Sequence, residues 1–494
     1  MAKKFHKAVN RGLLLWREDG VDRAWLAEKL TSLGVSFAFP EPWMKEAITS
    51  EGLEHFSHFE RSESFAETRL TMLAMQNRQD FTGTFRVVDR DVEIRALLLR
   101  IFSKLLIEKF DFGVFGVTPH DHEQAAIEAA MRWLGIPVLF FQPSLVGPQS
   151  APRTSLTTMF DYEIPKSTRK KYSAELAEIV RLAESSIERL EAGGGTPKMS
   201  NQMRSEIQSR SFMGRLRAIF YTVSRLRRGV HQASTNFSGH SVLMPWFTKP
   251  LEIVLNWSLR KSLVNRIFSL PSEIPDLKGK FALFALHYEP ERCSIPEGYP
   301  FQTQIDAVLR ARALLPDDVV LIVKEHFSQS AASLRGILGR GPETYRLLED
   351  TPGIRVVGIK ANTPKLISKA ECVFTLTGKV GIEAALKQIP VVFGGQPWWH
   401  EMPGSLSLAS ISSQDELSDF LSSPQPSRDR IFDWLSSKFK EDLLPILGDY
   451  SVERYVDRIS PLPPRYLELQ TEVAADTIHT FVTRVLKTDR GQPR

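Results

Sequence analysis

Cysteine is scarce in this sequence, and long hydrophobic runs are absent. The two cysteines, Cys293 and Cys372, are far apart and lack metal-type spacing, which argues against a disulfide framework and a zinc site. No stretch reaches the roughly 18 apolar residues that a transmembrane helix needs, and the amino-terminal run GLLLW is too short for a signal-peptide core. We therefore expect a cytoplasmic protein, for which peripheral attachment to the inner face of the membrane stays open.

Sequence signatures of several other functions are also missing. No Gly-x-Gly-x-x-Gly follows a predicted strand, which argues against a nicotinamide-dependent enzyme. The basic residues cluster in one segment without a recognised binding motif, so we expect no nucleic-acid partner. No convincing cluster of metal ligands stands out, and we predict neither a metal nor another cofactor. The Asp-x-Asp at Val88 to Val92, a pattern linked with metal-bound nucleotide sugars, is better explained as a helix cap.

The chain has 494 residues with the composition of a soluble globular protein, so two or three domains are expected. Strands alternate with helices in two parts of it, which predicts two doubly wound, Rossmann-like α/β domains. The first occupies residues 1–164 and the second residues 276–412. Residues 165–275 predict a basic helical insert or linker, and residues 413–494 predict a helical tail.

The stretch from Cys372 to Pro397 is the clearest strand-turn-helix-strand unit of the second domain. CVFTLT is an apolar, β-branched strand that ends at Gly378, and the helical pattern IEAALKQ follows Gly381. Ligands of open α/β sheets bind at the carboxyl ends of the strands. Thr375, Thr377 and Gly378 offer hydroxyl and backbone N–H groups there, and the positive end of the helix dipole suits a phosphate.

Glu383 lies about one turn inside this predicted helix. At that position its carboxylate could accept hydrogen bonds from the hydroxyl groups of a ribose. The alternative is that Glu383 is a first-turn residue that only complements the helix dipole.

Two further strands of the second domain end in polar turns, in the segments LHYEPE and KEHF. Parallel strands place such turns side by side, so the turns form one crevice with the Thr375 turn. Lys324 and His326 could bind a phosphate, the first as a charge and the second as a donor. His287 and Glu289 complete the set of candidate nucleotide-binding residues.

The first domain has a polar turn of its own, TPHDHEQ, at the predicted carboxyl end of a strand. Its histidines and acids suit a general base that acts on a hydroxyl group. We rank Asp121 ahead of His120 and Glu123 as the catalytic base that activates the acceptor. The alternative is that Asp121 caps the following helix and that the acids only form its first turn.

A basic segment lies between Arg204 and Arg228, with seven arginines against one glutamate and with apolar residues in between. An amphipathic basic helix of this kind can lie on anionic lipid or hold an acidic acceptor. It can equally be a solvated helix that packs on the domain.

The segments ALHYEPE, FQTQ, VLIVKEH and TLTGKVGIEAALKQIPVVFGGQPWW, in this order, resemble the bacterial capsule and surface polysaccharide biosynthesis proteins. That family includes glycosyltransferases that add Kdo (3-deoxy-manno-octulosonic acid) from its CMP-activated form. The resemblance implies a GT-B fold, in which two Rossmann-like domains face a cleft, with the nucleotide on the carboxyl-terminal domain and the acceptor on the amino-terminal one. It also implies that His326 and the Thr375 to Gly378 turn hold the CMP phosphate and that Glu383 binds the ribose.

The sequence departs from the pattern of this family at two places. Phe327 stands where the family usually has proline, and Lys379 and Ile382 stand where a small residue and tryptophan are usual. Neither change removes a residue that we expect to bind the nucleotide. Both weaken the assignment of Kdo as the sugar.

We therefore predict a metal-independent glycosyltransferase that uses a nucleotide-sugar donor, CMP-Kdo or a related CMP-sugar, to build a cell-surface polysaccharide. Its partners would be that donor, a glycan or glycolipid acceptor, and anionic membrane through the basic segment. The alternatives are a non-catalytic protein that binds or exports polysaccharide, and a GT-B transferase or epimerase that uses a UDP-sugar.

Overall fold

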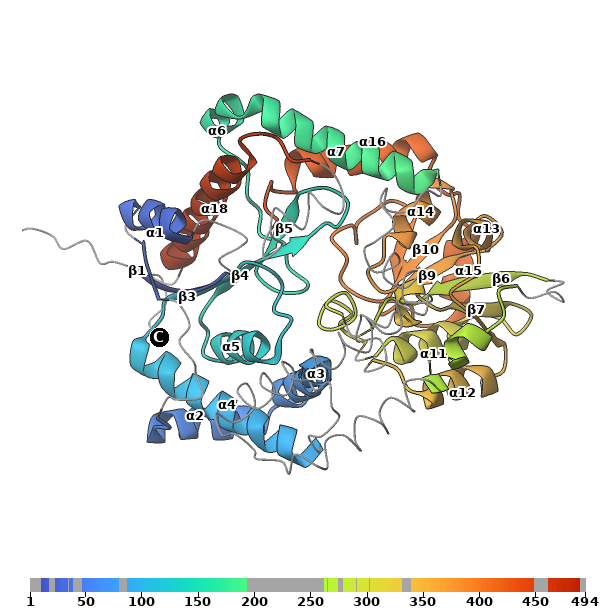
Figure 1. Cartoon of the computed structure of the whole chain (residues 1–494), viewed down its shortest axis with the longest axis horizontal. Coiled ribbons are helices and arrows are strands. Elements are labelled where there is room, and N and C mark those ends of the chain that lie inside the picture. Colours follow the sequence, from blue (N-terminus) through green and yellow to red (C-terminus); the bar gives the residue numbers. More distant parts are fainter. Residues whose placement is uncertain are drawn as a thin grey trace, which may run out of the picture. The chain divides into compact units, whose positions relative to one another are not determined.

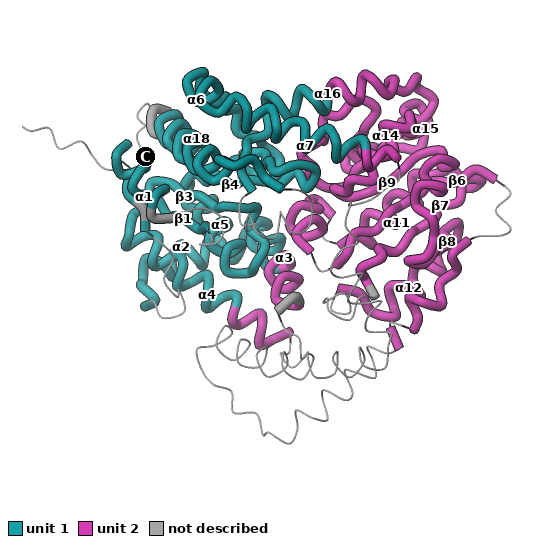
Figure 2. The backbone as a smooth tube through the Cα atoms, turned by 45° about the horizontal axis from the view of Figure 1, so that its top comes forward, with its two compact units in different colours: residues 1–69, 94–188, 435–494 teal, residues 70–93, 189–434 magenta. Residues whose placement is uncertain are grey.

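The structure is a computed structural model that divides into two compact units, shown in Figure 2. Unit 1 comprises Met1–Arg69, Ile94–Glu188 and Leu435–Arg494, and unit 2 comprises Leu70–Glu93 and Arg189–Trp434. The structure describes residues 10–16, 23–33, 35–38, 47–79, 87–192, 262–263, 265–273, 279–289, 291–301, 303–330, 339–447 and 461–488. The basic segment of residues 204–228 lies outside these residues, and its contact with membrane stays a prediction.

Unit 1 is built on a five-stranded sheet in the order β2-β1-β3-β4-β5. The strands are β1 (Asn10–Leu15), β2 (Val35–Ala38), β3 (Phe112–Phe115), β4 (Val138–Pro143) and β5 (Ser150–Arg153). All neighbouring pairs are parallel except β4 and β5, which are antiparallel. The chain runs from β1 outward to β2 and then returns to the other side of β1 for β3, so the strand order reverses between β1 and β3.

Helices cover both faces of this sheet. Figure 1 shows α1 and α18 on one face and α5 on the other. The core joins apolar residues of the central strands, such as Leu14 and Phe112, to Leu469, Val473 and Phe481 of α18. The carboxyl-terminal helix is therefore part of unit 1, which its position in the sequence does not indicate. The helices with residues in this unit are α1 (Arg23–Ser32), α2 (Ser50–Glu60), α3 (Glu63–Gln79), α4 (Val87–Glu108), α5 (His122–Trp133), α6 (Lys166–Lys171), α7 (Ser173–Glu191), α16 (Arg428–Glu441) and α18 (Tyr466–Thr488).

Unit 2 contains a six-stranded, fully parallel sheet in the order β11-β10-β9-β6-β7-β8. The strands are β6 (Phe281–Ala285), β7 (Val320–Lys324), β8 (Ile354–Val357), β9 (Val373–Thr375), β10 (Val391–Phe393) and β11 (Ser405–Ser407). The chain fills one side of β6 with β7 and β8 and then crosses to the other side for β9. The strand order therefore reverses between β6 and β9, and such a switch point is where open α/β sheets bind ligands.

The remaining helices of unit 2 pack around its sheet. Those in the described part of the unit include α11 (Gln304–Leu314), the 3₁₀ helix η2 (Phe327–Ser330), α12 (Pro342–Asp350), α13 (Thr363–Ile367), α14 (Val380–Leu386) and α15 (Gln414–Ser422). Gly381 lets α14 approach its surroundings closely, because a Cβ atom at this position would lie 2.5 Å from the Trp399 ring. The apolar core of the unit joins the central strands to α11, α12 and α15.

The predicted fold class is confirmed: the chain is α/β, with two doubly wound, Rossmann-like units and additional helices, which fits a GT-B-like fold. The Asp-x-Asp does not precede a helix as expected, since Asp89 and Asp91 lie inside the first turns of α4. None of the helices in the described residues is long and apolar enough to cross a membrane.

Candidate nucleotide site at the switch point of unit 2

The structure brings the three predicted turns together at the reversal between β6 and β9. His287 follows β6, and its Nε2 lies 3.3 Å from Thr375 Oγ1 of β9. The same nitrogen accepts a hydrogen bond of 3.1 Å from the backbone N–H of Thr377. The turn after β6 is therefore bonded directly to the turn after β9, as the parallel topology predicts.

The hydrogen bond from Thr377 defines the tautomer of His287. A backbone N–H can only donate, so Nε2 must accept and the neutral ring carries its proton on Nδ1. Burial and the positive charge of Arg340 lower the pKa of His287 to about 4, which keeps the ring neutral at physiological pH. Nδ1–H donates to no group in the described part of the chain and is available to a ligand.

His326 has the opposite tautomer. The backbone N–H of Ser328 donates to its Nδ1 over 3.2 Å, which leaves the proton on Nε2. Burial, His287 and the nearby cations Lys324, Arg340 and Lys379 lower the pKa of His326 to about 3. The ring is partly exposed and donates no hydrogen bond within the described residues, so it offers a second neutral N–H donor.

Lys324 is the last residue of β7 and is only 8% exposed. Its ammonium donates a hydrogen bond of 3.1 Å to the carbonyl of Glu325, and no described carboxylate lies within 4 Å of it. An ammonium group has three N–H donors, so this buried cation has unused hydrogen-bonding capacity. Burial without a carboxylate partner is costly and lowers the pKa of Lys324, whereas a bound anion would offset that cost.

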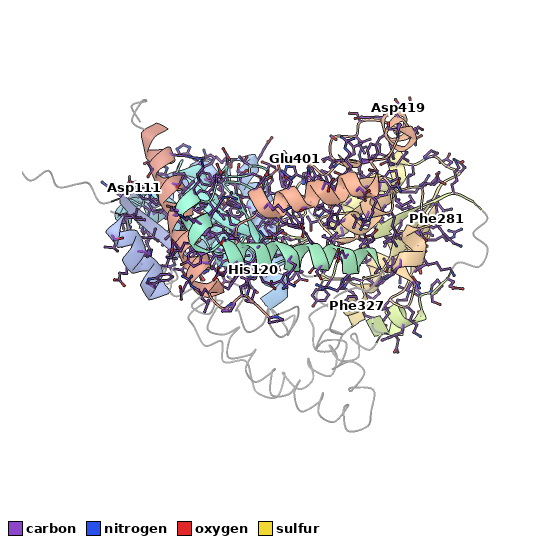
Figure 3. All side chains as sticks on the ribbon, turned by 90° about the horizontal axis from the view of Figure 1, so that it is seen from above. Asp111, His120, Phe281, Phe327, Glu401 and Asp419 are labelled. Carbon is purple, nitrogen blue, oxygen red and sulfur yellow. The ribbon has the colours of Figure 1, made fainter. Side chains whose placement is uncertain are left out.

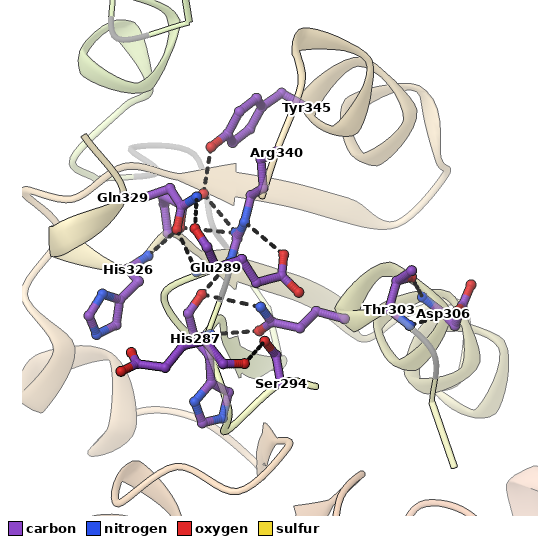
Figure 4. A network of polar contacts seen from close by, with 12 residues as sticks. His287, Glu289, Ser294, Thr303, Asp306, His326, Gln329, Arg340 and Tyr345 are labelled. Carbon is purple, nitrogen blue, oxygen red and sulfur yellow. Dashed lines mark hydrogen bonds and ion pairs between the residues drawn. The ribbon is translucent and has the colours of Figure 1, made fainter. Parts of the chain in front are cut away.

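A buried ion network lies beneath these donors, as Figure 4 shows. Arg340 Nη1 lies 3.0 Å and 2.8 Å from the two carboxylate oxygens of Glu325, and the Tyr345 hydroxyl donates to the same carboxylate over 2.6 Å. Arg340 Nη2 donates to the His287 carbonyl, and Nε lies 3.3 Å from Glu289 Oε2. The network ties the turn after β6 to the turn after β7 and balances the charge of Arg340 with two carboxylates.

The backbone of the turn after β6 is held by two buried glutamines. Gln304 Oε1 accepts from the His287 N–H over 2.6 Å, and its Nε2 donates to the His287 carbonyl over 3.2 Å. Gln329 makes the equivalent pair with Glu289, at 3.0 Å and 2.9 Å. Glu289 is thus fixed through both its backbone and its ion pair with Arg340, and direct nucleotide binding by Glu289 stays a prediction.

The threonine side chains of the turn after β9 form hydrogen bonds with other residues of the protein. The Thr377 hydroxyl donates to the Cys293 carbonyl over 2.9 Å, and the Thr375 hydroxyl is buried against His287. A Cβ atom at Gly378 would lie 2.7 Å from Thr375 Oγ1, so only glycine fits there. The backbone N–H groups of Gly378 and Val380 bond to no described acceptor. These N–H groups, rather than the hydroxyls, are what the turn offers to an anion.

Glu383 lies in the first turn of α14, as predicted. Its partly exposed carboxylate accepts no hydrogen bond from the described residues. Burial raises the pKa of Glu383 to about 7, although Lys379 and Lys387 act in the opposite direction. The Lys379 charge also lowers the pKa of His326, so both groups lie within its electrostatic reach.

In unit 1, the TPHDHEQ turn follows β3, at the point where the strand order of that sheet reverses. Asp121 is the N-cap of α5 and accepts from the Gln124 N–H over 2.8 Å. The backbone N–H of His120, labelled in Figure 3, lies 3.4 Å from Gln124 Oε1. The Glu123 carboxylate has no hydrogen-bond donor among the described residues. Burial and the charge of Asp121 raise the pKa of Glu123 to about 7.

Comparisons with known proteins were made for the whole chain. No protein-family model matches it, and no curated protein matches it. Among solved structures, the β-Kdo 2,4 transferase KpsC of Thermosulfurimonas dismutans is 9% identical, with 87% of this chain and 90% of that chain covered and a TM-score of 0.28. The structural neighbours thus include a transferase of the kind that the sequence resembles.

Two other neighbours are structures with bound nucleotides. The S. aureus MnaA–UDP co-structure is 10% identical, with 96% of both chains covered and a TM-score of 0.21. UDP-GlcNAc 2-epimerase of Methanocaldococcus jannaschii, in complex with UDP-GlcNAc and UDP, is 12% identical, with 86% of this chain and 98% of that chain covered and a TM-score of 0.21.

From the sequence we assign no role to four residues that the structure places in the site, Gln304, Gln329, Arg340 and Tyr345, although Gln304 belongs to the FQTQ segment. They act through hydrogen bonds to residues distant in the chain, for which no local pattern exists. The described residues hold no group of three or more His, Cys, Asp or Glu side chains that could bind a metal ion.

Proposed function

We propose that the chain is a glycosyltransferase that takes its sugar from a nucleotide-activated donor, a CMP-sugar, and builds a cell-surface polysaccharide. One observation carries the proposal. Among the described residues, the switch point of unit 2 gathers a buried ammonium with no carboxylate partner, two neutral imidazole N–H donors and a carboxylate that accepts no hydrogen bond. Unused cationic and N–H donors suit a phosphate, and an unused acceptor suits the hydroxyl groups of a ribose.

In this proposal, Lys324 and His326 bind the phosphate of the donor, together with the N–H groups of Gly378 and Val380. Glu383 accepts hydrogen bonds from the ribose, for which its negative form is the better acceptor. The His287 ring is held by Thr377, so its Nδ1–H is a donor of fixed direction. A CMP-sugar has a single phosphate, and Lys324 and His326 together with the backbone N–H groups could stabilise it as a leaving group without a divalent metal ion.

The proposed reaction moves the sugar from the CMP phosphate to a hydroxyl group of a glycan or glycolipid acceptor. The bond between the anomeric carbon and the phosphate oxygen breaks, and its electron pair stays on the phosphate. The bond between the acceptor oxygen and the anomeric carbon forms, and a carboxylate base takes the hydroxyl proton. Lys324 and the imidazole N–H groups stabilise the charge that grows on the leaving phosphate. We propose Glu123 as the base, since Asp121 already caps α5.

His326→Ala and Glu383→Gln should each weaken CMP binding by about tenfold to hundredfold, because a lost hydrogen bond to a charged group costs about 1.5–3 kcal/mol. Isothermal titration calorimetry with CMP and with UDP measures this directly. Glu371→Gln is the matched control, since Glu371 is exposed at the opposite end of β9 and should leave both affinities unchanged.

Tighter binding of UDP than of CMP by the wild-type protein would overturn the CMP assignment and favour a UDP-sugar enzyme. Unchanged CMP affinity in both variants would refute the site. Absence of binding to any nucleotide would favour the non-catalytic polysaccharide-binding protein.

A further inference from the structure

The turn after β6 continues past the last hydrogen bond that joins it to the neighbouring strand. The last ladder bond on the β7 side runs from the Leu286 N–H to the Lys324 carbonyl, over 3.0 Å. Past this point, the N–H and carbonyl of Glu289 both bond to the side-chain amide of Gln329. One side chain thus supplies the donor and the acceptor that a neighbouring strand would otherwise provide.

Gln329 also belongs to the turn that carries His326. It lies in η2, and its backbone N–H donates to the His326 carbonyl over 3.0 Å. Its side chain is fully buried, and both ends of the amide are used. Figure 4 shows Gln329 in the polar network that also contains His326 and Glu289. Gln329 therefore joins the turn of His287 directly to the turn of His326, in addition to the ion network of Arg340.

We propose that Gln329 is a positioning residue for the donor phosphate, a role that rests on the proposed function of this site. Its paired hydrogen bonds hold the two turns in the geometry that the phosphate needs before the ligand arrives. Binding then costs less ordering of the loops, which raises the affinity without a contact between Gln329 and the ligand. Gln304 fixes only the turn after β6, because its side chain bonds to His287 and it lies on α11.

The variant Gln329→Glu distinguishes a role of the paired hydrogen bonds from a role of the side chain in packing alone. A neutral carboxylic acid has the shape of the amide and can accept from the Glu289 N–H while its O–H donates to the Glu289 carbonyl. An ionised carboxylate can only accept, and it would face that carbonyl oxygen. Burial raises the pKa of such a carboxyl group, while Arg340 acts in the opposite direction and Glu289 and Glu325 add to the effect of burial. The neutral form is therefore favoured as the pH falls.

The experiment is CMP titration calorimetry on wild type, Gln329→Glu, Gln329→Met and the exposed control Gln414→Glu, from pH 5 to pH 8. The readout is the dissociation constant of CMP for the variant divided by that for wild type at the same pH. Glu383 titrates in all of these proteins, so its effect on CMP binding cancels in this ratio. We expect a ratio of roughly ten to one hundred for Gln329→Glu at pH 8, with recovery to within about twofold at pH 5. Gln329→Met should bind CMP weakly at every pH, and Gln414→Glu should bind CMP as tightly as wild type does.

Circular dichroism at each pH confirms that the titrated protein is folded. A ratio for Gln329→Glu that does not fall toward pH 5, or a Gln329→Met protein that binds CMP as wild type does, overturns the inference. Wild-type protein that binds no nucleotide refutes the proposed function instead, so the two failures are distinguishable.

Discussion

Arg340→Met is expected to lower the free energy of unfolding by about 3–5 kcal/mol. The side chain of Glu325 is 0% exposed to solvent, and that of Arg340 is 1% exposed. Without the guanidinium, the Glu325 charge stays buried, and its donors among the described residues are the Tyr345 hydroxyl and the His326 backbone N–H. Removing one partner of a buried ion pair lowers the free energy of unfolding by far more than the intact pair contributes to it. The reason is that the remaining charge is desolvated and has no opposite charge beside it. Urea unfolding followed by circular dichroism measures the loss.

The exposed ion pair of Arg346 and Glu343 provides the matched control. Its side chains are 66% and 76% exposed, and its distance of 3.0 Å is similar to that of the buried pair. Arg346→Ala should therefore change the free energy of unfolding by at most about 1 kcal/mol. If Arg340→Met does not fold, the double variant Arg340→Met, Glu325→Met should recover soluble protein, since of the two carboxylates that face Arg340 only that of Glu289, whose side chain is 12% exposed, then remains. A loss for Arg340→Met as small as that for Arg346→Ala would contradict the account.

The strands that form the two sheets are predictable because burial on both faces gives them continuous apolar sequences. FGVF and VLFF in unit 1, and FALFA and VLIV in unit 2, are of this kind. The short strands β5 and β11 have no such pattern, and they form only where the edge of an existing sheet is available to pair. Their sequences, SAPR and SLS, have weak strand propensity of their own.

The location of the site is also predictable, since the carboxyl ends of parallel strands meet at one edge. His287, His326 and Thr375 were expected to lie together for this reason, and direct hydrogen bonds join the first and last of them. The roles within the site are less predictable. A sequence shows that a threonine follows a strand, but not that its hydroxyl donates to the carbonyl of Cys293 in another loop.

The same limit explains why the glutamines and Arg340 were missed. Gln304 is the first residue of a well-capped helix, and nothing in that position signals that its amide pairs with the backbone of His287. Arg340 follows a stretch without a clear pattern, and its importance comes from Glu325 and Glu289, which are remote in the chain. Long-range hydrogen bonds of this kind depend on the finished fold and leave no periodic signal.

The TPHDHEQ turn shows how environment separates neighbouring carboxylates into different roles. Asp121 uses one oxygen to cap α5, an interaction whose loss typically costs about 1 kcal/mol of stability. Glu123 has no hydrogen-bond donor among the described residues, and burial with the adjacent Asp121 charge raises its pKa to about 7. A general base is most effective when its pKa is close to the working pH. We therefore propose Glu123 as the base ahead of Asp121, which we rank first from the sequence; both assignments stay predictions.

Glu123→Gln should lower turnover by about two to four orders of magnitude while CMP affinity stays unchanged, because the base acts on the acceptor hydroxyl and not on the nucleotide. A base must be deprotonated to act, and the pKa of Glu123 is raised to about 7. Wild-type activity at low substrate concentration should accordingly rise with pH through about 7 and then level off. Asp121→Asn should keep most of the activity and nearly all of the stability, because the asparagine amide oxygen can still accept from the Gln124 N–H and cap α5. Transfer assays with purified protein across this pH range, paired with CMP calorimetry, measure both quantities. Wild-type turnover in Glu123→Gln, together with a loss of two orders of magnitude in Asp121→Asn, would return the role of base to Asp121.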